Sequence, residues 1–192
     1  MSGNDEKPFR EPLLALAYLQ AFAARYRSGY YEKYIESLHL EGSERMLEYG
    51  SGPGVASAFL ARTLTGGCLT CVDISKVWMR FARRTAGRYP NVEFLQGDLS
   101  DLEIGDESYD GAFVHFMLHD IPASQRSEKI GILVSKLKRG GRVYLREPTR
   151  EKHGMPAEEI RAILGRHGLK EISSGTGNSP VGWPTFQCIY VK

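Results

Sequence analysis

Hydrophobic and polar positions divide most of the chain into short apolar blocks and longer amphipathic stretches. The amphipathic stretches predict helices at 54–65, 76–89, 124–137 and 156–167. The apolar blocks predict strands at 45–49, 68–72, 92–95, 109–116, 142–145, 169–173 and 185–191. Pro90 and the pairs Gly66-Gly67 and Gly140-Gly141 are expected to end helices. Strands that alternate with helices across short joints indicate an α/β fold around a parallel sheet.

The region before the first predicted strand has a different pattern. Residues 13–40 have helical periodicity and many aromatic side chains, and Gly29 predicts a break into two helices. Tyr26, Tyr30 and Tyr34 recur every four residues, which predicts one packing face.

Composition narrows the classes of protein. The chain has 192 residues, the length of one domain. Its 25 basic and 23 acidic residues give a net charge of +2, which is too balanced for an electrostatic nucleic-acid binder. The longest apolar stretch, 13–24, is shorter than the roughly 18 residues that a membrane span needs.

The N-terminus and the cysteines indicate a cellular setting. Residues 1–12 contain two prolines and five charged residues, so we expect a mobile tail and no signal peptide. Three cysteines are too few for a disulfide framework. A reducing, cytoplasmic location is therefore expected.

The loop after the first predicted strand contains Gly50, Gly52 and Gly54. Glycines between a strand and a helix let the backbone approach a ligand closely, although an ordinary turn is the alternative. Gly50 and Gly54 are four residues apart, whereas the dinucleotide fingerprint of dehydrogenases needs five. Glu48, just before the loop, would repel a pyrophosphate and favour a ligand that carries a cation.

Two more acidic residues follow predicted strands. Asp73 lies 23 residues after Gly50, where an acid can accept both ribose hydroxyls of a nucleoside. Asp98 follows the third strand and could accept a hydrogen bond from an adenine amine. Each acid alone is also typical of a helix cap or a solvated loop. Together with Glu48 and the glycine loop, they indicate a nucleoside site.

The chain resembles the class I S-adenosylmethionine-dependent methyltransferases, in particular the small-molecule branch that includes the ubiquinone and menaquinone biosynthesis methyltransferases. The resemblance covers residues 44–192 and is carried, in family order, by E-Y-G-S-G-P-G, V-D-I-S, Q-G-D-L, S-Y-D-G-A-F-V-H-F-M-L-H-D-I and L-K-R-G-G-R-V-Y-L-R-E-P. It implies a Rossmann-like, seven-stranded, mostly parallel sheet with order 3-2-1-4-5-7-6, an antiparallel last strand and helices on both faces.

The resemblance also implies roles for individual residues. Residues 1–43 would form a tail and a helical cap over the active site of a domain at 44–192, with Tyr26, Tyr30 and Tyr31 as lid or substrate contacts. Binding of S-adenosylmethionine is assigned to these positions: Glu48, Gly50, Ser51, Gly52, Gly54, Asp73, Ile74, Asp98, Leu99 and His115. Glu48 would lie near the methionine end, and Asp73 would hold the ribose.

Methyl transfer from a sulfonium is an in-line displacement, so the protein mainly aligns the nucleophile. A hydroxyl or a protonated amine also needs a base. His119 and Glu147 follow the fourth and fifth strands and are the candidates, with Asp120 as a substrate contact. Structural packing is the alternative for His119.

Two motifs that could suggest a metal lack the required context. His115-x-x-x-His119 has Phe116 where a zinc protease has glutamate. Cys68-x-x-Cys71 has no second pair and lies on a predicted buried strand, which favours core residues. No metal site is expected.

The sequence predicts an enzyme that transfers a methyl group from S-adenosylmethionine to a small molecule, as a monomer or homodimer and without a nucleic-acid partner. Three alternatives stay open: an inactive accessory subunit that binds the cofactor, a methyltransferase for protein or RNA, and an aminopropyl transferase. The last normally carries acidic polyamine-site motifs, which are not found here.

Overall fold

The computed structural model describes residues 9–192, which form two compact units. Glu11–Glu103 make up one unit, and Ile104–Lys192 make up most of the other. The predicted boundary between residues 43 and 44 does not coincide with this division, and it stays a prediction. Most of the predicted mobile tail lies outside the described residues.

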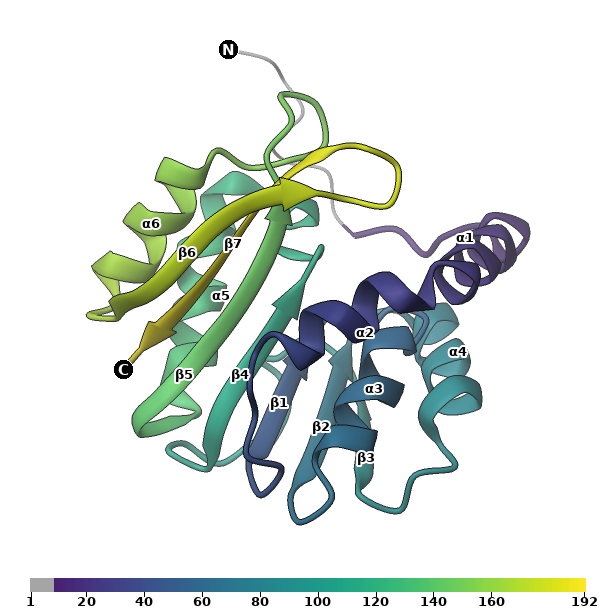
Figure 1. The fold of residues 1–192 in the computed structure, drawn as a ribbon, viewed down its shortest axis with the longest axis horizontal. Helices are drawn as coiled ribbons and strands as arrows, with labels where there is room; N and C mark the ends of the chain where they lie inside the picture. The colour runs from purple at the N-terminus through teal and green to yellow at the C-terminus, as the bar shows by residue number, and fades with distance from the viewer. Residues whose placement is uncertain (1–8) are drawn as a thin grey trace. The chain divides into compact units, whose positions relative to one another are not determined.

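The unit of residues 11–103 contains three parallel strands with β2 between β1 and β3 (Figure 1). Its elements are α1 (Leu14–Tyr26), α2 (Ser28–Glu36), β1 (Arg45–Tyr49), α3 (Val55–Thr63), β2 (Cys68–Asp73), α4 (Lys76–Ala86) and β3 (Val92–Gln96). Nearly every side chain of β1 and β2 is buried, as expected for parallel strands that are covered on both faces.

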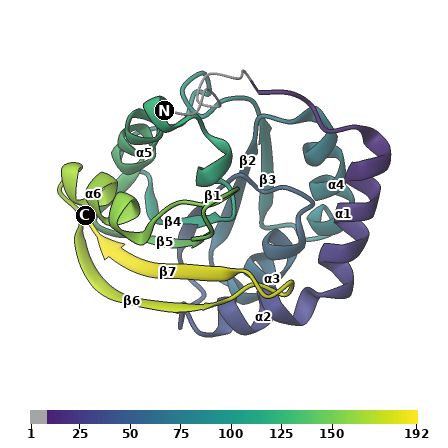
Figure 2. The ribbon, with the colours of Figure 1, turned by 90° about the horizontal axis from the view of Figure 1, so that it is seen from above.

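The unit of residues 104–192 contains four strands. Its elements are β4 (Tyr109–His115), the single 3-10 turn η1 (Leu118–Asp120), α5 (Ala123–Ser135), β5 (Leu137–Pro148), α6 (Ala157–Arg166), β6 (Lys170–Asn178) and β7 (Pro184–Val191). β4 and β5 are parallel, whereas β7 lies antiparallel between β5 and β6. Figure 2 shows β6 and β7 curving side by side.

The strand order is β3-β2-β1-β4-β5-β7-β6 in a seven-stranded sheet. This order and the antiparallel last strand confirm the α/β, Rossmann-like fold that the resemblance implied. The strands come in the predicted sequence, and most of their bounds agree to within one or two residues.

Two local predictions are wrong. Gly140-Gly141 does not close a helix: α5 ends at Ser135, and β5 starts at Leu137 and runs through both glycines. The reason is non-local, because Gly140 N–H donates to the carbonyl of Lys192 and Lys192 N–H donates to that of Gly141.

The N-terminal helices break at Arg27 instead of at Gly29, which lies inside α2. Because of this break, the tyrosines do not share one packing face. Tyr34 is buried in α2, whereas Tyr26 ends α1 and is 83% exposed. No helix within residues 9–192 is long and apolar enough to cross a membrane.

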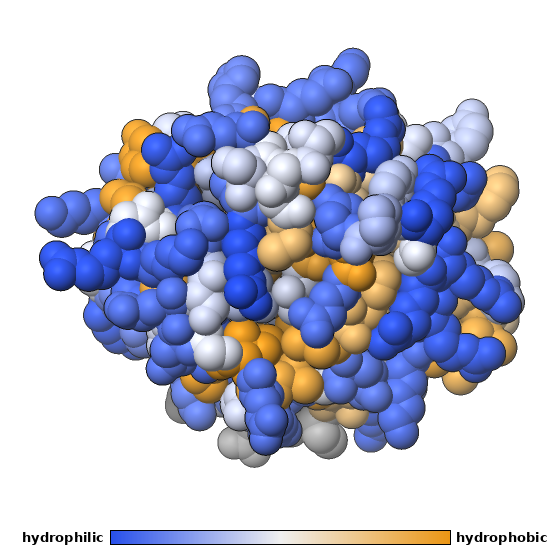
Figure 3. All heavy atoms as spheres, turned by 90° about the horizontal axis from the view of Figure 1, so that it is seen from below, coloured by the Kyte–Doolittle hydropathy of each residue, from blue (hydrophilic) through white to orange (hydrophobic). Residues whose placement is uncertain are grey.

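Hydrophilic side chains predominate on the face that Figure 3 shows, and smaller apolar patches lie between them. Single apolar side chains at a surface are ordinary and need no explanation. A continuous exposed apolar face, in contrast, indicates an interaction surface, and α1 has such a face.

Candidate functional site

The glycine loop between β1 and α3 is held against β2 by its own backbone. The N–H groups of Gly50 and Ser51 both donate to the carbonyl oxygen of Val72. Gly50, Gly52 and Gly54 all have positive φ angles, of 83°, 50° and 77°, which only glycine adopts readily. The three glycines are therefore required by the shape of the loop.

Gly54 and Gly52 serve different purposes. A Cβ on Gly54 would lie 2.6 Å from the Cα of Ala82, so this glycine lets α3 and α4 pack closely. A Cβ on Gly52 would have nothing within 4 Å, so the backbone there borders open space. The neighbouring Ser51 hydroxyl is buried, yet it has no hydrogen-bond partner among residues 9–192. An open backbone beside an unsatisfied hydroxyl fits a ligand that crosses this loop.

Asp73, at the end of β2, links the glycine loop to the start of α4. One carboxylate oxygen accepts from Gly52 N–H at 2.8 Å, and the other accepts from Ser75 N–H at 2.9 Å. Burial raises the pKa of Asp73, and the two backbone hydrogen bonds oppose that rise. A carboxylate has about four acceptor positions, so Asp73 retains capacity for the hydroxyls of a ligand.

Glu11 is a residue of this site that sequence reasoning missed. Its carboxylate accepts from the Ser75 hydroxyl at 2.6 Å and from Lys76 N–H at 2.7 Å, at the N-terminus of α4. The Ser75 hydroxyl in turn accepts from Trp78 N–H, as an N-cap does. No local pattern marks Glu11, because its partners lie 64 residues or more along the chain. This contact anchors the end of the segment that was predicted to be mobile.

Glu48, on β1 just before the loop, is buried and does not point to solvent. Its Oε2 accepts from the Ser57 hydroxyl at 2.5 Å and from the Cys71 thiol at 3.2 Å. Burial raises the pKa of Glu48 to about 7, against the lowering effect of these two hydrogen bonds, and the charge of Asp73 raises it further. Glu48 thus changes charge near neutral pH, and a nearby cation would favour its ionised form.

Burial and the charge of Glu48 raise the pKa of Cys71 well above its usual value. Cys71 therefore stays a thiol that donates to Glu48, as expected of a core cysteine. Cys68 and Cys188 are also free.

Asp98, the third acidic residue predicted to bind the cofactor, stabilises the turn that follows β3. Asp98 accepts from the backbone N–H and from the hydroxyl of Ser100, at 3.0 and 2.8 Å. The Leu99 side chain is 1% exposed and belongs to the core, so only its backbone is available to a ligand. Ile74 is 39% exposed and could pack on a flat ring. The binding roles of these residues stay predictions.

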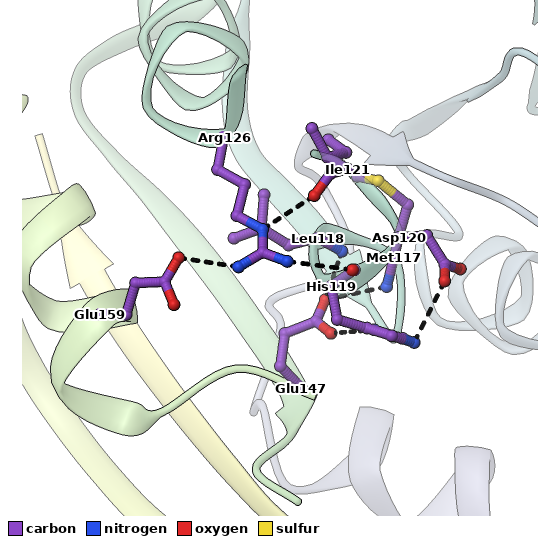
Figure 4. A network of polar contacts seen from close by, with 8 residues as sticks. All are labelled: Met117, Leu118, His119, Asp120, Ile121, Arg126, Glu147 and Glu159. Atoms are coloured by element: carbon purple, nitrogen blue, oxygen red, sulfur yellow. Dashed lines mark hydrogen bonds and ion pairs between the residues drawn. The ribbon is translucent and has the colours of Figure 1, made fainter. Parts of the chain in front are cut away.

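A second cluster lies in the unit of residues 104–192, where His119 and Glu147 meet (Figure 4). Glu147 is fully buried at the end of β5. Its Oε1 accepts from the N–H groups of Met117 and Leu118, at 2.8 and 2.7 Å, and its Oε2 lies 2.6 Å from His119 Nδ1. Because a carboxylate only accepts, Nδ1 carries the proton and Nε2 keeps its lone pair.

The surroundings of His119 make it a stronger base than a free imidazole. Burial, the largest effect, lowers the pKa of His119, but the hydrogen bond and the charge of Glu147 together with the charge of Asp120 give a net rise. Asp120 Oδ1 lies 3.5 Å from Nε2, on a side chain that is 79% exposed. A proton taken up at Nε2 would thus be stabilised from both sides of the ring.

Arg126 of α5 holds the backbone of this cluster, and sequence reasoning missed it. Its guanidinium donates to the carbonyl oxygens of Ile121 and His119, at 2.9 and 3.1 Å, and to Glu159 Oε1 at 2.8 Å (Figure 4). An arginine on a helix is usually solvated, so no signal in the sequence singles it out.

The remaining predicted residues take no part in the hydrogen bonds that His119 and Glu147 make among residues 9–192. Burial, helped by the charge of Arg146, lowers the pKa of His115 to about 3, so its ring is neutral and a poor base. Tyr30 and Tyr31 have their rings 5.8 Å apart in α2. No group of three or more potential ligands in residues 9–192 is arranged to hold a metal ion.

The chain is similar to known methyltransferases. The family described as a methyltransferase domain matches residues 46–141. A demethylmenaquinone methyltransferase from Clavibacter sepedonicus is 31% identical over 104 residues, which cover 54% of this chain and 41% of that protein. A fatty-acid O-methyltransferase from Mycolicibacterium smegmatis is 29% identical over 135 residues, which cover 70% of this chain and 47% of that protein. The chain thus spans less than half the length of either relative.

The fold is shared with solved structures. One is the N-methyltransferase NodS from Bradyrhizobium japonicum WM9 in complex with S-adenosyl-l-homocysteine, with a TM-score of 0.72 and 18% sequence identity. The similarity covers 88% of this chain and 86% of that one. At this identity the comparison establishes the fold.

Proposed function

Because the chain belongs to the methyltransferase domain family, we propose that it binds S-adenosylmethionine and transfers the methyl group to a small-molecule acceptor. The observation that carries this proposal is the open backbone at Gly52, flanked by the buried, unsatisfied Ser51 hydroxyl and by Asp73. S-Adenosylmethionine, when bound, supplies a methyl group that its positive sulfur already activates.

The residues of the glycine loop and of the strand ends would hold the cofactor. The free acceptor positions of Asp73 suit ribose hydroxyls, and Ile74 offers an exposed apolar surface for adenine. Asp98 and the Leu99 backbone would contact the adenine edge. Glu48, whose pKa is about 7, would become fully ionised beside the ammonium of the methionine group. The role of the His115 backbone, which the family resemblance implies, stays a prediction.

We assign His119 as the base, with Glu147 holding its ring. The Nδ1 proton is donated to Glu147, so Nε2 accepts the proton of the acceptor. Glu147 then stabilises the imidazolium that forms. This arrangement is useful for acceptors with a hydroxyl or a protonated amine. It favours an active enzyme over an inactive accessory subunit, which would not need a buried, oriented base.

Calorimetry with S-adenosylhomocysteine, S-adenosylmethionine and NAD tests the cofactor. We expect binding of the two sulfur nucleosides and no binding of NAD. Asp73→Ala should raise the Kd about tenfold, since a charged acceptor of this kind contributes about 1.5–3 kcal/mol. Asp101→Ala, on an exposed carboxylate nearby in the sequence, is the control. Binding of NAD alone, or an unchanged Kd in Asp73→Ala, would contradict the proposal.

The acceptor is identified by mass spectrometry. The protein is incubated with S-adenosylmethionine and panels of hydroxylated, amino and quinol compounds, and a gain of one methyl group is sought. The two relatives act, by their names, on demethylmenaquinone and on fatty acids, so apolar acceptors come first. Methylation of added protein or RNA, with none of small molecules, would favour the macromolecular alternative.

A further inference from the structure

Helix α1 buries small side chains and exposes large apolar ones, whereas an ordinary surface helix buries its large apolar side chains. Its inward positions are small: Ala17 is fully buried, and Ala21 and Ala24 are partly buried. Its large side chains point outward, and Phe22 and Tyr26 are 72% and 83% exposed. The outward apolar face consists of Leu16, Leu19, Phe22 and Tyr26.

This outward face is continuous. Residues spaced by three, three and four positions lie on the same side of a helix. α1 contains only two residues that are strongly polar, Gln20 and Arg25. A helix that is apolar on all sides is normally buried, and a contiguous exposed apolar patch marks an interaction surface. Nothing in residues 9–192 covers this one.

Positive charge lies directly beside this face, on α4. Tyr18 of α1 packs edge-on against Phe81 of α4 with ring centroids 4.9 Å apart, and α1 runs along the outside of α4 (Figure 2). In Figure 1, α1 lies above α4. The groove between the two helices is lined by Leu14, Tyr18, Val77, Arg80, Phe81 and Arg84. Arg80 and Arg84 are exposed there, next to apolar side chains.

The charge of the two helices is of one sign. α1 and α4 together contain no acidic residue. Their basic residues are Arg25, Lys76, Arg80, Arg83 and Arg84. Arg83 donates a hydrogen bond to the carbonyl oxygen of Phe94. Arg80 and Arg84 are exposed, and within residues 9–192 neither donates such a bond.

We propose that α1 and the basic edge of α4 form a docking surface for an anionic lipid bilayer. Leu16, Leu19, Phe22 and Tyr26 would enter the boundary between headgroups and acyl chains, and Arg80 and Arg84 would contact lipid phosphates. An interfacial helix usually carries both its apolar and its basic residues itself. Here α4 supplies most of the basic residues, since Arg25 is the single basic residue of α1.

The chemistry of the surface favours a bilayer over a protein partner. A bilayer interface accepts leucine and aromatic side chains without a shape-matched pocket, and long arginine side chains reach its phosphates. α1, with 13 residues, rises about 20 Å, which is too short to span a bilayer but sufficient to lie along its surface.

Co-sedimentation of the full chain with vesicles tests this surface. We expect binding to phosphatidylcholine vesicles that contain roughly 30% phosphatidylserine, much weaker binding to phosphatidylcholine alone, and a loss of binding at high salt. Vesicle binding is measured without methyl transfer, so failure here and failure of the proposed transferase activity are separate results.

A pair of substitutions and a matched control pair measure the contribution of positive charge to vesicle binding. Arg80→Gln with Arg84→Gln should weaken vesicle binding about 25-fold, since each arginine near the surface contributes about fivefold. Arg139→Gln with Arg142→Gln removes the same charge from exposed sites on β5. This control should leave binding within about twofold, because the apolar face of α1 and both Arg80 and Arg84 are unchanged.

The apolar contribution has its own matched control. Leu19→Gln with Phe22→Gln should weaken vesicle binding more than about tenfold, because both side chains would leave the membrane interface. The melting temperature should stay unchanged, since both are exposed. Ile172→Gln, on the 51% exposed Ile172 of β6, should leave binding unchanged.

Several outcomes would overturn the proposal. The first is absence of binding to anionic vesicles, or binding that neither pair of substitutions weakens. The second is a dimer in solution that Leu19→Gln with Phe22→Gln dissociates, which would assign the face to a second copy of the chain. The third is binding of RNA or an acidic protein through Arg80 and Arg84, without vesicle binding.

Discussion

The glycine loop of residues 50–54 and the His119–Glu147 cluster are constructed by opposite means. In the loop, backbone groups dominate: Gly50 and Ser51 N–H groups bind Val72, and Gly52 N–H binds Asp73. In the cluster, side chains 28 residues apart in the sequence meet, and one carboxylate accepts from three donors.

This difference explains why one site can be recognised from the sequence and the other cannot. A loop made of backbone depends on φ angles, so glycine at fixed spacing reveals it in the sequence. A side-chain cluster depends on which strand ends lie next to each other. β4 and β5 are adjacent and parallel, and His115 pairs with Arg146 in their register. The register thus brings the residues after β4 to the end of β5.

The largest effect is expected in the cluster. His119→Ala should lower kcat about 100-fold or more for a hydroxyl acceptor, because a positioned base contributes about 10²–10⁴-fold. The Kd of S-adenosylhomocysteine should stay within about twofold, because the cofactor is assigned to other residues. Single-turnover kinetics and calorimetry measure the two quantities.

The coupling of His119 to Glu147 gives that experiment a control. Glu147→Gln should lower kcat nearly as much as His119→Ala does. An amide that donates to Nδ1 would leave the ring proton on Nε2, which could then no longer accept a proton. The kcat of the double variant should be little lower than that of either single variant. His39→Asn, at an exposed histidine elsewhere, should leave kcat unchanged. Additive losses would show that the two residues do not act as one unit.

The next effect separates two glycines of the loop. Gly54→Ala should destabilise the fold by about 3 kcal/mol, from its contact with Ala82 and from the left-handed φ. Gly52→Ala should cost only about 1 kcal/mol but raise the Kd of S-adenosylhomocysteine more than tenfold. Thermal unfolding and calorimetry on both variants check this. Equal behaviour of the two would remove the distinction between packing and ligand space.

A smaller effect concerns the buried carboxyl of Glu48. Its pKa is raised from 4.5 to about 7 in the folded protein, so the stability it contributes at low pH is lost as pH rises from about 4.5 to 7. Glu48→Gln does not titrate. Its melting temperature relative to the parent should therefore rise by about 5 °C between pH 5 and pH 8, for about 2 kcal/mol. Parallel melting curves would contradict the assignment.

The smallest effect concerns the pH dependence of turnover. His119 must be neutral to act as a base, and its pKa is raised, so kcat should rise with pH through a value above 6.5. Asp120→Asn removes a charge that raises this pKa and should move the rise to lower pH by a few tenths of a unit. The shift is small because Asp120 is exposed and screened by solvent. High salt should reproduce it in the parent protein, and an upward shift would reverse the assignment.

The sequence predicted the alternation of strands and helices and, through the family resemblance, the strand order. It also placed Asp73, Gly52 and Ser51 in one region, because strand ends and glycines are local signals. It did not predict that Gly140-Gly141 would enter β5, because the partner of these glycines is the chain end at Lys192. The position of the helix break at Arg27 was also missed, because a single glycine weakens a helix by only about 1 kcal/mol and does not have to end it.

What the sequence alone determined is therefore the fold class and the backbone of the glycine loop, since periodicity and glycine spacing act over a few residues. Only the tertiary structure decided that Glu147 orients His119, that Arg126 holds the turn beside it and that Glu11 caps α4. The sequence also showed that α1 is rich in apolar residues, but only the structure showed that the large ones are exposed. Contacts between residues that are distant in the chain depend on how the elements pack, and local patterns do not carry that information.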